Sequence, residues 1–257
     1  MLVEERRSRL ANLVRTLRFA SLIELAEELD VSESTIRRDL ERLEEQGTAK
    51  RIHGGVLYSG SEPMLPHFEA RKPSQSARKT RIAQVAAELV DDGDTILLDG
   101  GSTTYEVARL LVGRPLHLLT TSLPVANLFA SDGASELIFI GGNICSRTGV
   151  ARGPLADEML GKLSVGKTIL SVAGITDEGF YNNSVMLVGT ERAMMRSAGE
   201  VIVVADSSKF GRKSLARLCE LSQVGTLVVD HYITEDWRAK VLAAGVKLLV
   251  AAAAEET

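Results

Sequence analysis

Two stripes of apolar residues follow each other near the start of the chain, at the spacing of helices that bury one face. They consist of Leu22, Leu25, Ala26 and Leu29, and of Ile36, Leu40 and Leu43. Ser21 and Glu24 have the spacing of a capping box, so the first helix is predicted to begin at Ser21. Ser32 is predicted to cap the second helix and Gly47 to follow its end. The pattern therefore predicts two short amphipathic helices joined by a tight turn.

A basic hairpin is predicted directly after these helices, at residues 48–58 (TAKRIHGGVLY). Two helices, a turn and a hairpin make up a winged helix-turn-helix, whose second helix enters the major groove of DNA. Base edges in that groove are read by short hydrogen-bond donors and arginines. Helix pairs with surface arginines also occur in proteins that never touch nucleic acid, and periodicity alone leaves this alternative open. The predicted DNA-binding residues are Ser32, Ser34, Thr35, Arg37 and Arg38 on the second helix and Lys50, Arg51 and His53 on the hairpin.

Short apolar runs alternate with helical patterns from Thr80 onward. The runs are TILLD, LHLLT, LIFIG, TILSVA, VIVVAD, TLVVD and KLLVA, and the segments between them include TRIAQVAAELVDD and TTYEVARLL. This alternation is typical of a mainly parallel sheet covered by helices. Ligands of such sheets bind where a strand ends and the next helix begins, so the loops after the strands are the places to search.

A stretch rich in proline and small polar residues separates the two patterns, with Pro63, Pro66 and Pro73 in SGSEPMLPHFEARKPSQSARK. This composition is typical of a linker, and a mobile tether is the preferred interpretation. Docking of Phe68 and Arg71 onto one of the domains is the alternative. We expect a DNA-binding domain at residues 1–58, a linker at residues 59–79 and an α/β effector-sensing domain at residues 80–257.

Length and composition agree with two folded domains, since 257 residues with 45% hydrophobic side chains can bury real cores. Charge does not by itself favour DNA binding. Residues 1–60 hold ten Lys and Arg against eleven Asp and Glu, a net charge of −1, so only the arrangement of the charges can favour it. A single small module with few phosphate contacts binds weakly, so we expect a homo-oligomer, a dimer or a tetramer.

No apolar run approaches the roughly 18 residues that a spanning helix needs, and the N-terminus lacks the pattern of a signal peptide. We therefore expect a cytoplasmic protein without a membrane partner. Cys145 and Cys219 lack the spacing of a zinc site or a disulfide framework. No metal and no cofactor are expected.

The first of four candidate phosphate loops follows the strand that ends at Asp99. Gly100 and Gly101 let the backbone come close to an anion, and hydroxyls and amides at a helix start can hold phosphate oxygens. The segment is neither a Walker A loop nor a full GxGxxG fingerprint, so a nucleotide is not implied. Taken alone, the loop favours plain capping by Ser102 or Thr103.

Three further loops after strands carry hydroxyl-rich or basic residues. Ser122 is predicted to cap a helix, which leaves Thr120 and Thr121 for a ligand. Arg152 and Lys209 could bind phosphate, although solvated side chains are the default for both. Four such loops in one sheet together favour a small phosphorylated polyol or sugar. The predicted effector-binding residues are Asp99, Gly100, Gly101, Ser102, Thr103, Thr104, Thr120, Thr121, Ser122, Gly142, Arg152 and Lys209.

The motifs resemble one family in order and in detail. VSESTIRRDLERLEEQG followed by KRIHGG closely resembles the winged helix of the DeoR-type bacterial regulators of sugar metabolism, and DGGSTT, TTSLPVA and ADSSKFG follow in the order of that family's sensor domain. The resemblance implies a winged helix-turn-helix followed by a mainly parallel α/β sheet domain similar to ribose-5-phosphate isomerase. It also implies a transcriptional regulator, expected to be a repressor, whose affinity for operator DNA is modulated by a phosphorylated sugar.

The kinship to isomerases raises one alternative, a sugar-phosphate isomerase with a DNA-binding appendage. Isomerases carry an acidic motif close to DGADE where this chain has VAGITDEG, so that Ala173 replaces the first acid and Thr176 stands near the second. Asp177 and Glu178 remain nearby, but this segment also has the composition of an exposed turn. We therefore predict no catalytic residue and no enzyme.

Tyr181, Asn182 and Asn183 stand where the family that this chain resembles often has small residues and threonines. Two interpretations of these three residues stay open. Asparagines read sugar hydroxyls and a tyrosine ring packs on a sugar face, so the three could line the pocket. An asparagine turn before a helix is the alternative.

Overall fold

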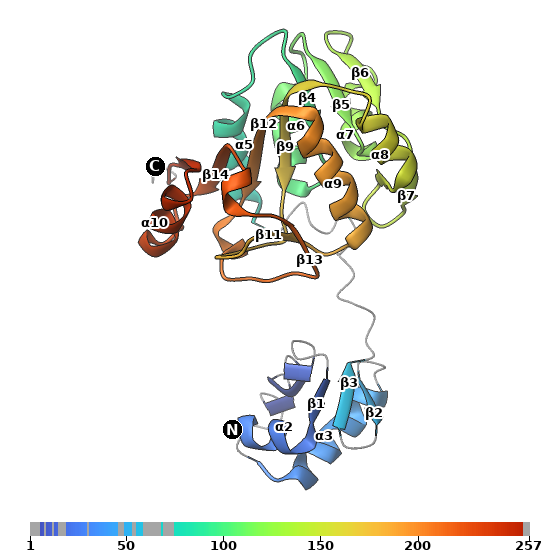
Figure 1. The fold of residues 1–257 in the computed structure, drawn as a ribbon, viewed down its shortest axis with the longest axis vertical. Coiled ribbons are helices and arrows are strands. Elements are labelled where there is room, and N and C mark those ends of the chain that lie inside the picture. The colour runs from blue at the N-terminus through green and yellow to red at the C-terminus, as the bar shows by residue number, and fades with distance from the viewer. Residues whose placement is uncertain are drawn as a thin grey trace. The chain divides into compact units, whose positions relative to one another are not determined.

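The structure is a computed structural model in which the chain forms two compact units, residues 1–64 and 65–257 (Figure 1). It describes residues 75–253, Phe68 and, in the first unit, residues 6–7, 9–11, 13–14, 19–29, 31–45, 49–52 and 55–58. Only the backbone is described at positions 19, 20, 45, 50–52, 57 and 58. Of the expected linker, the structure describes Phe68 and residues 75–79, and helix α5 already begins at Ser76.

The first unit has the predicted pair of helices and a small antiparallel sheet. Its elements are α2 (Leu22–Leu29), α3 (Glu33–Glu45) and the strands β1 (Phe19–Ser21), β2 (Ala49–Ile52) and β3 (Gly55–Tyr58), in the sheet order β1-β3-β2. The predicted hairpin is confirmed as β2 and β3, whereas β1 was not expected. Its core is formed by Leu10, Val14, Leu25, Leu29, Ile36, Leu40, Leu43, Ala49 and Val56.

Side-chain caps set the starts of both helices. The amide of Ser21 donates to Oε2 of Glu24 over 2.8 Å, and the amide of Glu24 donates to Oγ of Ser21 over 3.2 Å, so the capping box is confirmed. The amide of Thr35 donates to Oγ of Ser32 over 3.3 Å, as the second cap requires. Gly47 lies outside the described residues.

The second unit is built on a seven-stranded sheet in which every neighbouring pair is parallel. Each of the seven predicted apolar runs forms one strand, so this part of the fold expectation is confirmed. In sheet order the strands are β15 (Lys247–Ala251), β14 (Thr226–Asp230), β12 (Ala198–Ala205), β9 (Val165–Ser171), β4 (Thr95–Leu98), β5 (His117–Thr120) and β6 (Glu136–Phe139).

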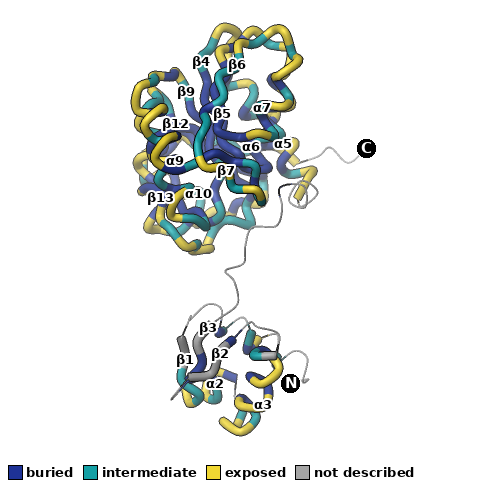
Figure 2. The backbone as a smooth tube through the Cα atoms, turned by 90° about the vertical axis from the view of Figure 1, so that its right-hand side faces the viewer, coloured by how far each residue is buried: buried dark blue, intermediate teal, exposed yellow. Residues whose placement is uncertain are grey.

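Helices cover both faces of this sheet, and the strand alternation explains how. Ile96 and Leu98 of β4 pack with α5 (Ser76–Ala87), α6 (Ser102–Leu111) and α7 (Leu123–Phe129). Leu97 points the other way and packs in the core formed with α8 (Pro154–Leu160), α9 (Val185–Ser197) and α10 (Glu235–Ala243). The strands therefore form the buried centre and the helices the outer layers (Figure 2).

Shorter elements extend from the carboxyl ends of the large sheet. They are the hairpin β7 (Asn143–Cys145) and β8 (Val150–Arg152), the antiparallel sheet of β10 (Gly174–Thr176), β11 (Gly179–Asn182) and β13 (Ala216–Cys219), and the turn η1 (Ser207–Lys209). A second turn, η2 (Leu221–Gln223), leads into the amino end of β14. Among the described residues, no helix is long and apolar enough to cross a membrane. Within the same residues, no three His, Cys, Asp or Glu side chains gather as metal ligands.

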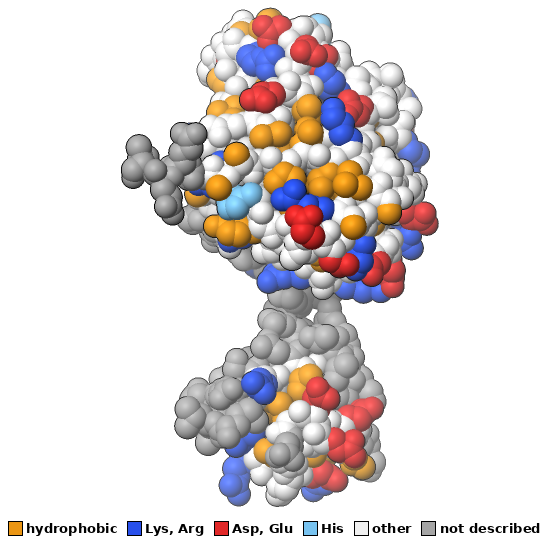
Figure 3. Space-filling model, turned by 90° about the vertical axis from the view of Figure 1, so that its left-hand side faces the viewer, with side chains coloured by type: hydrophobic (Ala, Val, Ile, Leu, Met, Phe, Trp, Pro, Cys, Tyr) orange, Lys and Arg blue, Asp and Glu red, His pale blue; other side chains and the backbone are white. Residues whose placement is uncertain are grey.

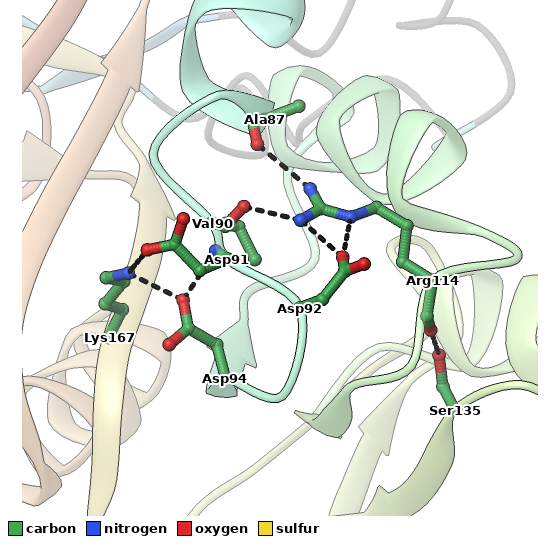
Figure 4. Close-up of polar contacts among 8 residues, drawn as sticks. All are labelled: Ala87, Val90, Asp91, Asp92, Asp94, Arg114, Ser135 and Lys167. Atoms are coloured by element: carbon green, nitrogen blue, oxygen red, sulfur yellow. Dashed lines mark hydrogen bonds and ion pairs between the residues drawn. The ribbon is translucent and has the colours of Figure 1, made fainter.

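Polar contacts at the amino ends of β4, β5 and β9 tie α5 to the sheet (Figure 4). The guanidinium of Arg114 donates to the carbonyl oxygens of Ala87, over 3.3 Å, and Val90, over 2.7 Å. Nζ of Lys167 lies 2.6 Å from a carboxylate oxygen of Asp94. Because the last carbonyls of a helix lack partners within it, Arg114 supplies donors that the end of α5 needs.

The substitution Arg114→Ala is expected to lower the free energy of unfolding of the second unit by about 1–3 kcal/mol. The carbonyl of Val90 loses its guanidinium donor, and the carbonyl of Ala87 keeps only the amide of Val90. Fluorescence of Trp237, the one tryptophan of the chain, follows urea unfolding of this unit. Lys162→Ala removes only the surface ion pair with Glu158 and is the control, with an expected change below about 0.5 kcal/mol. Equal midpoints for both variants would contradict the role of Arg114.

Candidate functional site

The loops that carry the predicted effector residues leave the large sheet at one edge. Because β4, β5, β9 and β12 are neighbours and parallel, their carboxyl ends lie together. The residues that follow these ends are Asp99 to Thr104 after β4, Thr121 and Ser122 after β5, Val172 after β9 and Asp206 to Lys209 after β12.

The buried carboxylate of Asp99 shapes the first loop. Its Oδ1 accepts a hydrogen bond from the amide of Gly101 over 2.9 Å, and its Oδ2 accepts from the amide and the hydroxyl of Ser171 over 2.8 and 3.0 Å. Burial raises the pKa of Asp99, and these donors act against that rise. Since both oxygens are engaged, Asp99 positions the loop from within.

Gly100 and Gly101 are required here by close packing. A Cβ at Gly100 would lie 2.1 Å from Cγ2 of Val150, and a Cβ at Gly101 would lie 1.6 Å from Oγ of Ser171. The N-cap of α6 is Gly101, which has no capping side chain, so the expectation of plain capping by a hydroxyl is wrong. Ser102, Thr103 and Thr104 form the first turn of α6, where amides without intrahelical partners favour an anion.

The hydroxyls of Thr120 and Ser122, at the end of β5 and in the loop after it, form hydrogen bonds within the fold. The hydroxyl of Thr120 donates to the carbonyl of Leu98 over 2.8 Å and accepts from the amide of Ser122 over 3.0 Å, so it is already engaged in the fold. Whether Thr120 also contacts an effector stays a prediction. Ser122 caps α7 by accepting from the amide of Val125 over 3.3 Å, as predicted.

Strand β8 brings the first two loops together with Arg152. The amide of Ala151 donates to the carbonyl of Thr121 over 2.8 Å, and Val150 packs beside Gly100. At the end of the strand, Nη1 of Arg152 donates to Oγ of Ser184 over 2.7 Å. Its Nε is buried and has no hydrogen-bond partner among the described residues. Arg152 therefore has one N–H donor, at Nε, that is not used within the described part of the fold and lies beside these loops.

Gly142 and Lys209 complete the predicted set. Gly142 has a φ of 154°, and a Cβ there would lie 3.1 Å from the carbonyl oxygen of Arg152. The absence of a side chain at Gly142 therefore lets the end of β8 pack closely against it. Nζ of Lys209 lies 3.8 Å from a carboxylate oxygen of Asp206, and the side chain is 30% exposed. Lys209 follows β12, which lies two places along the sheet from β4.

A polar cluster of Asn182, which the sequence analysis named, and Glu191, which it missed, adjoins the loop at Asp99. Nδ2 of Asn182 donates to the carbonyl oxygen of Ser171 over 3.2 Å and to Oε1 of Glu191 over 2.6 Å. Glu191 is 1% exposed. Burial, followed by the nearby charge of Asp99, raises the pKa of Glu191 to about 8. A glutamate on a helix usually faces water, yet this one falls on the stripe of Val188 and Met194, which was the available signal.

The turn interpretation is wrong for Tyr181 and Asn182, because both are buried in β11. The Tyr181 hydroxyl donates to Oε2 of Glu178 over 2.5 Å. Asp177 and Glu178 lie in the exposed turn between β10 and β11, as expected. Whether Asn183 contacts a ligand stays a prediction.

Phe68 docks onto the second unit instead of belonging to a mobile tether. Its ring packs edge-on against Tyr105 of α6 with centroids 5.1 Å apart, and its amide donates to the carbonyl of Arg147 over 3.1 Å. The preferred interpretation is thus wrong at Phe68, and the end of the connecting segment is attached to the helix that follows the Asp99 loop. Arg71 lies outside the described residues.

On the first unit, α3 and its cap Ser32 carry five of the eight predicted DNA-binding residues. Ser32, Ser34, Arg37 and Arg38 are exposed and Thr35 is partly exposed. On the face drawn in Figure 3, acidic side chains of this unit gather mainly away from Lys and Arg. Lys50 and Arg51 lie in β2 without described side chains, and His53 lies outside the described residues.

A buried carboxylate anchors the opposite side of α3. Asp39 is 1% exposed, and its oxygens lie 2.7 Å from Nε of Arg6 and 2.9 Å from Nε of Arg7. Burial acts to raise the pKa of Asp39, but the two guanidinium groups hold it below its usual value. The helix is thereby attached to the N-terminal segment while its arginines stay exposed.

Comparison with known families now settles the relationship. The model of the DeoR C terminal sensor domain matches residues 74–231, and that of the DeoR-like helix-turn-helix domain matches residues 6–62. The chain belongs to the DeoR family. This confirms the resemblance predicted from sequence, and the protein is a DNA-binding transcriptional regulator with a sensor domain.

Several characterised relatives are similar over most of their length. The transcriptional repressor AccR of Agrobacterium fabrum is 33% identical over 88% of this chain and 89% of its own. The glycerol-3-phosphate regulon repressor of Escherichia coli is 32% identical over 88% and 90%, and the L-fucose operon activator of Haemophilus influenzae is 31% identical over 84% and 88%.

Solved structures show lower similarity to this chain. A ribose 5-phosphate isomerase from Methanocaldococcus jannaschii has a TM-score of 0.40 and 20% identity, covering 55% of this chain and 56% of that chain. The eIF2B delta subunit from Chaetomium thermophilum has a TM-score of 0.44 and 16% identity, covering 62% and 59%.

The raised pKa of Glu191 predicts a pH-dependent stability. The unfolded chain ionises this group near 4.5 and the folded chain near 8, so the folded state binds one more proton between these values and loses stability as pH rises through that window. Glu191→Gln is expected to lose less stability than the unchanged protein between pH 5 and pH 8, measured by urea unfolding followed by Trp237 fluorescence. Glu158→Gln, at an exposed position, is the control, and identical pH profiles for the Glu191 variant and the unchanged protein would contradict the assignment.

Proposed function

We propose that the second unit binds a phosphorylated sugar or polyol and that this effector alters the affinity of the first unit for operator DNA. The observation that carries the proposal is the meeting of three features at one edge of the sheet. They are the uncapped start of α6, the loop after β5, and Arg152 with its unpartnered buried Nε. Two relatives, a glycerol-3-phosphate regulon repressor and an L-fucose operon activator, support the same class of effector.

The phosphate would occupy the start of α6. Amides of Ser102 to Thr104 and the positive end of the helix dipole attract its oxygens, and Arg152 adds a charged donor. Asp99 holds this turn in place through Gly101 and Ser171 without contacting the anion. Lys209 would reach other oxygens of the ligand from the loop after β12.

Effector binding changes DNA affinity only if it favours one conformational or assembly state over another. Phe68 gives a route for such a change, since it packs on Tyr105 of α6. A shift of α6 on phosphate binding would move the end of the segment that leads to the helix-turn-helix. We further propose that the protein is a repressor that acts in the cytoplasm as a homo-oligomer, because one small reading module binds DNA weakly.

Catalysis has little support in the geometry. Asp177 and Glu178, the acids nearest to the isomerase-like motif, lie in an exposed turn, and Glu178 pairs with Lys213 over 2.7 Å. A positioned base has to reach the proton that it removes. We therefore propose a sensor without isomerase activity, and interconversion of pentose or hexose phosphates by the purified protein would favour the enzyme instead.

Substitution of the exposed arginines of α3 tests the DNA-binding surface. Arg37→Ala and Arg38→Ala are each expected to weaken binding to duplexes selected from a random pool by about tenfold or more, because each removes base or phosphate contacts. Fluorescence anisotropy at fixed salt measures the affinity. Arg109→Ala removes an exposed arginine from α6 and is the control, and if it matched the effect of both α3 variants the surface would be misassigned.

Thermal stabilisation by sugar phosphates tests the effector site. A ligand that binds only the folded protein raises its melting temperature. Thr103→Ala, Arg152→Ala and Lys209→Ala are each expected to reduce the shift produced by the best stabilising sugar phosphate, whereas Lys213→Ala, on the β10–β11 side, leaves it unchanged. Full shifts in all three variants would rule out the proposed pocket.

A further inference from the structure

Three buried polar atoms lack hydrogen-bond partners around one short segment, residues 182–184. They are Nε of Arg152, Oδ1 of Asn183 and Oε2 of Glu191. Leaving a buried polar group unpaired is unfavourable, by about 1–3 kcal/mol each, so native proteins contain few of them. Three of the six such atoms in the described part of the chain belong to this segment or to residues hydrogen-bonded to it, and this grouping favours a ligand that supplies the missing partners.

Hydrogen bonds link the residues that carry these atoms or their neighbours in the chain. Arg152 bonds to Ser184 over 2.7 Å, Ser184 follows Asn183 in the chain, and Asn182 bonds to Glu191 over 2.6 Å. The segment 182–184 thus runs from the proposed phosphate-binding arginine to the buried acid.

The same cluster reaches the loop at the start of α6. Asn182 bonds to the carbonyl of Ser171, whose amide and hydroxyl bond to Asp99. Gly101, the N-cap of α6, donates to the other oxygen of Asp99. Ser171 is partly exposed, so the cluster reaches solvent there.

We propose that Asn183 and Glu191 form the hydroxyl-reading half of the effector site, opposite a phosphate half at Arg152 and α6. This assignment rests on the proposed function. Oδ1 of Asn183 accepts a hydrogen bond from one effector hydroxyl, and a second effector hydroxyl forms a hydrogen bond with Oε2 of Glu191. The two halves together fit a molecule that carries both a phosphate ester and free hydroxyls.

The charge of the cluster also selects against one class of effector. Asp99 and Glu191 are both buried acids, and the charge of Asp99 already disfavours ionisation of Glu191. A carboxylate on the ligand would add a further negative charge near the buried carboxylate of Asp99. The site therefore favours phosphates of neutral sugars and polyols over phosphates of sugar acids.

Matched ligand pairs test this preference. Calorimetry or thermal shift compares glycerol 3-phosphate with 3-phosphoglycerate and glucose 6-phosphate with 6-phosphogluconate, with ribose 5-phosphate and inorganic phosphate as further probes. The unchanged protein is expected to bind the neutral member of a pair more tightly. Glu191→Gln and Asn183→Ala are expected to weaken binding of the preferred neutral ligand by about tenfold and to leave inorganic phosphate binding unchanged.

The unliganded proteins supply the control for a merely structural role. Oδ1 of Asn183 and Oε2 of Glu191 have no partners among the described residues, and a glutamine at position 191 keeps the oxygen that accepts from Asn182. Neither variant is therefore expected to melt below the unchanged protein, whereas a structural role would lower the melting temperature of both. Glu158→Gln should match the unchanged protein throughout. If Glu191→Gln does not fold, Glu191→Asp replaces it in the experiment. This variant keeps the carboxyl group on a shorter side chain, and the same loss of affinity for the neutral ligand is expected.

The outcomes separate this inference from the proposed function. Binding of neutral sugar phosphates that is equal in the unchanged protein and in the Glu191 and Asn183 variants would overturn the hydroxyl-reading assignment and leave the phosphate sensor intact. Tighter binding of the acid member of each pair would also overturn it. If the unchanged protein bound none of the sugar phosphates, the proposed function itself would fail.

Discussion

The carboxylate of Asp99 connects the end of β4 with the end of β9, and the arrangement of the whole sensor edge depends on it. One oxygen holds the Gly101 turn that starts α6, and the other holds Ser171 at the end of the neighbouring strand. From Ser171 the hydrogen bonds continue through Asn182 to Glu191. A buried and fully bonded acid thus fixes the distance between a helix start that suits phosphate and a second acid that retains an unpaired oxygen.

The two edges of the parallel sheet have opposite character. At the amino ends of the strands, Arg114 and Lys167 meet backbone carbonyls and carboxylates, and these contacts stabilise the fold. At the carboxyl ends, Arg152, Asn183 and Glu191 keep unpaired buried atoms, which reduces stability in the free protein. Proteins commonly give up some stability at sites where a ligand later supplies the missing contacts.

The same division of roles is visible within the DNA-reading helix. Its buried side carries Asp39, whose pKa is lowered by Arg6 and Arg7 against the effect of burial, and this pairing fixes the helix to the segment before it. The exposed side leaves Ser34, Arg37 and Arg38 available. In both units, buried charge pairs or buried acids position the side chains that are offered to a partner.

Local patterns in the sequence determined the elements of this protein. The capping box at Ser21, the cap at Ser32 and the seven apolar runs specified helices and strands, because caps and periodicity act within a few residues. Motif order was also sufficient to place the chain in its family.

Tertiary structure alone decided which polar side chains remain for a ligand. Thr120 is engaged by Leu98, Asp99 by a residue 72 positions away, and Glu191 is buried because one side of α9 packs against the core and β11. The ring of Phe68 likewise packs against Tyr105 of α6, which belongs to a different segment of the chain. Hydrogen bonds and burial between distant segments leave no local periodicity, so a single sequence does not reveal them.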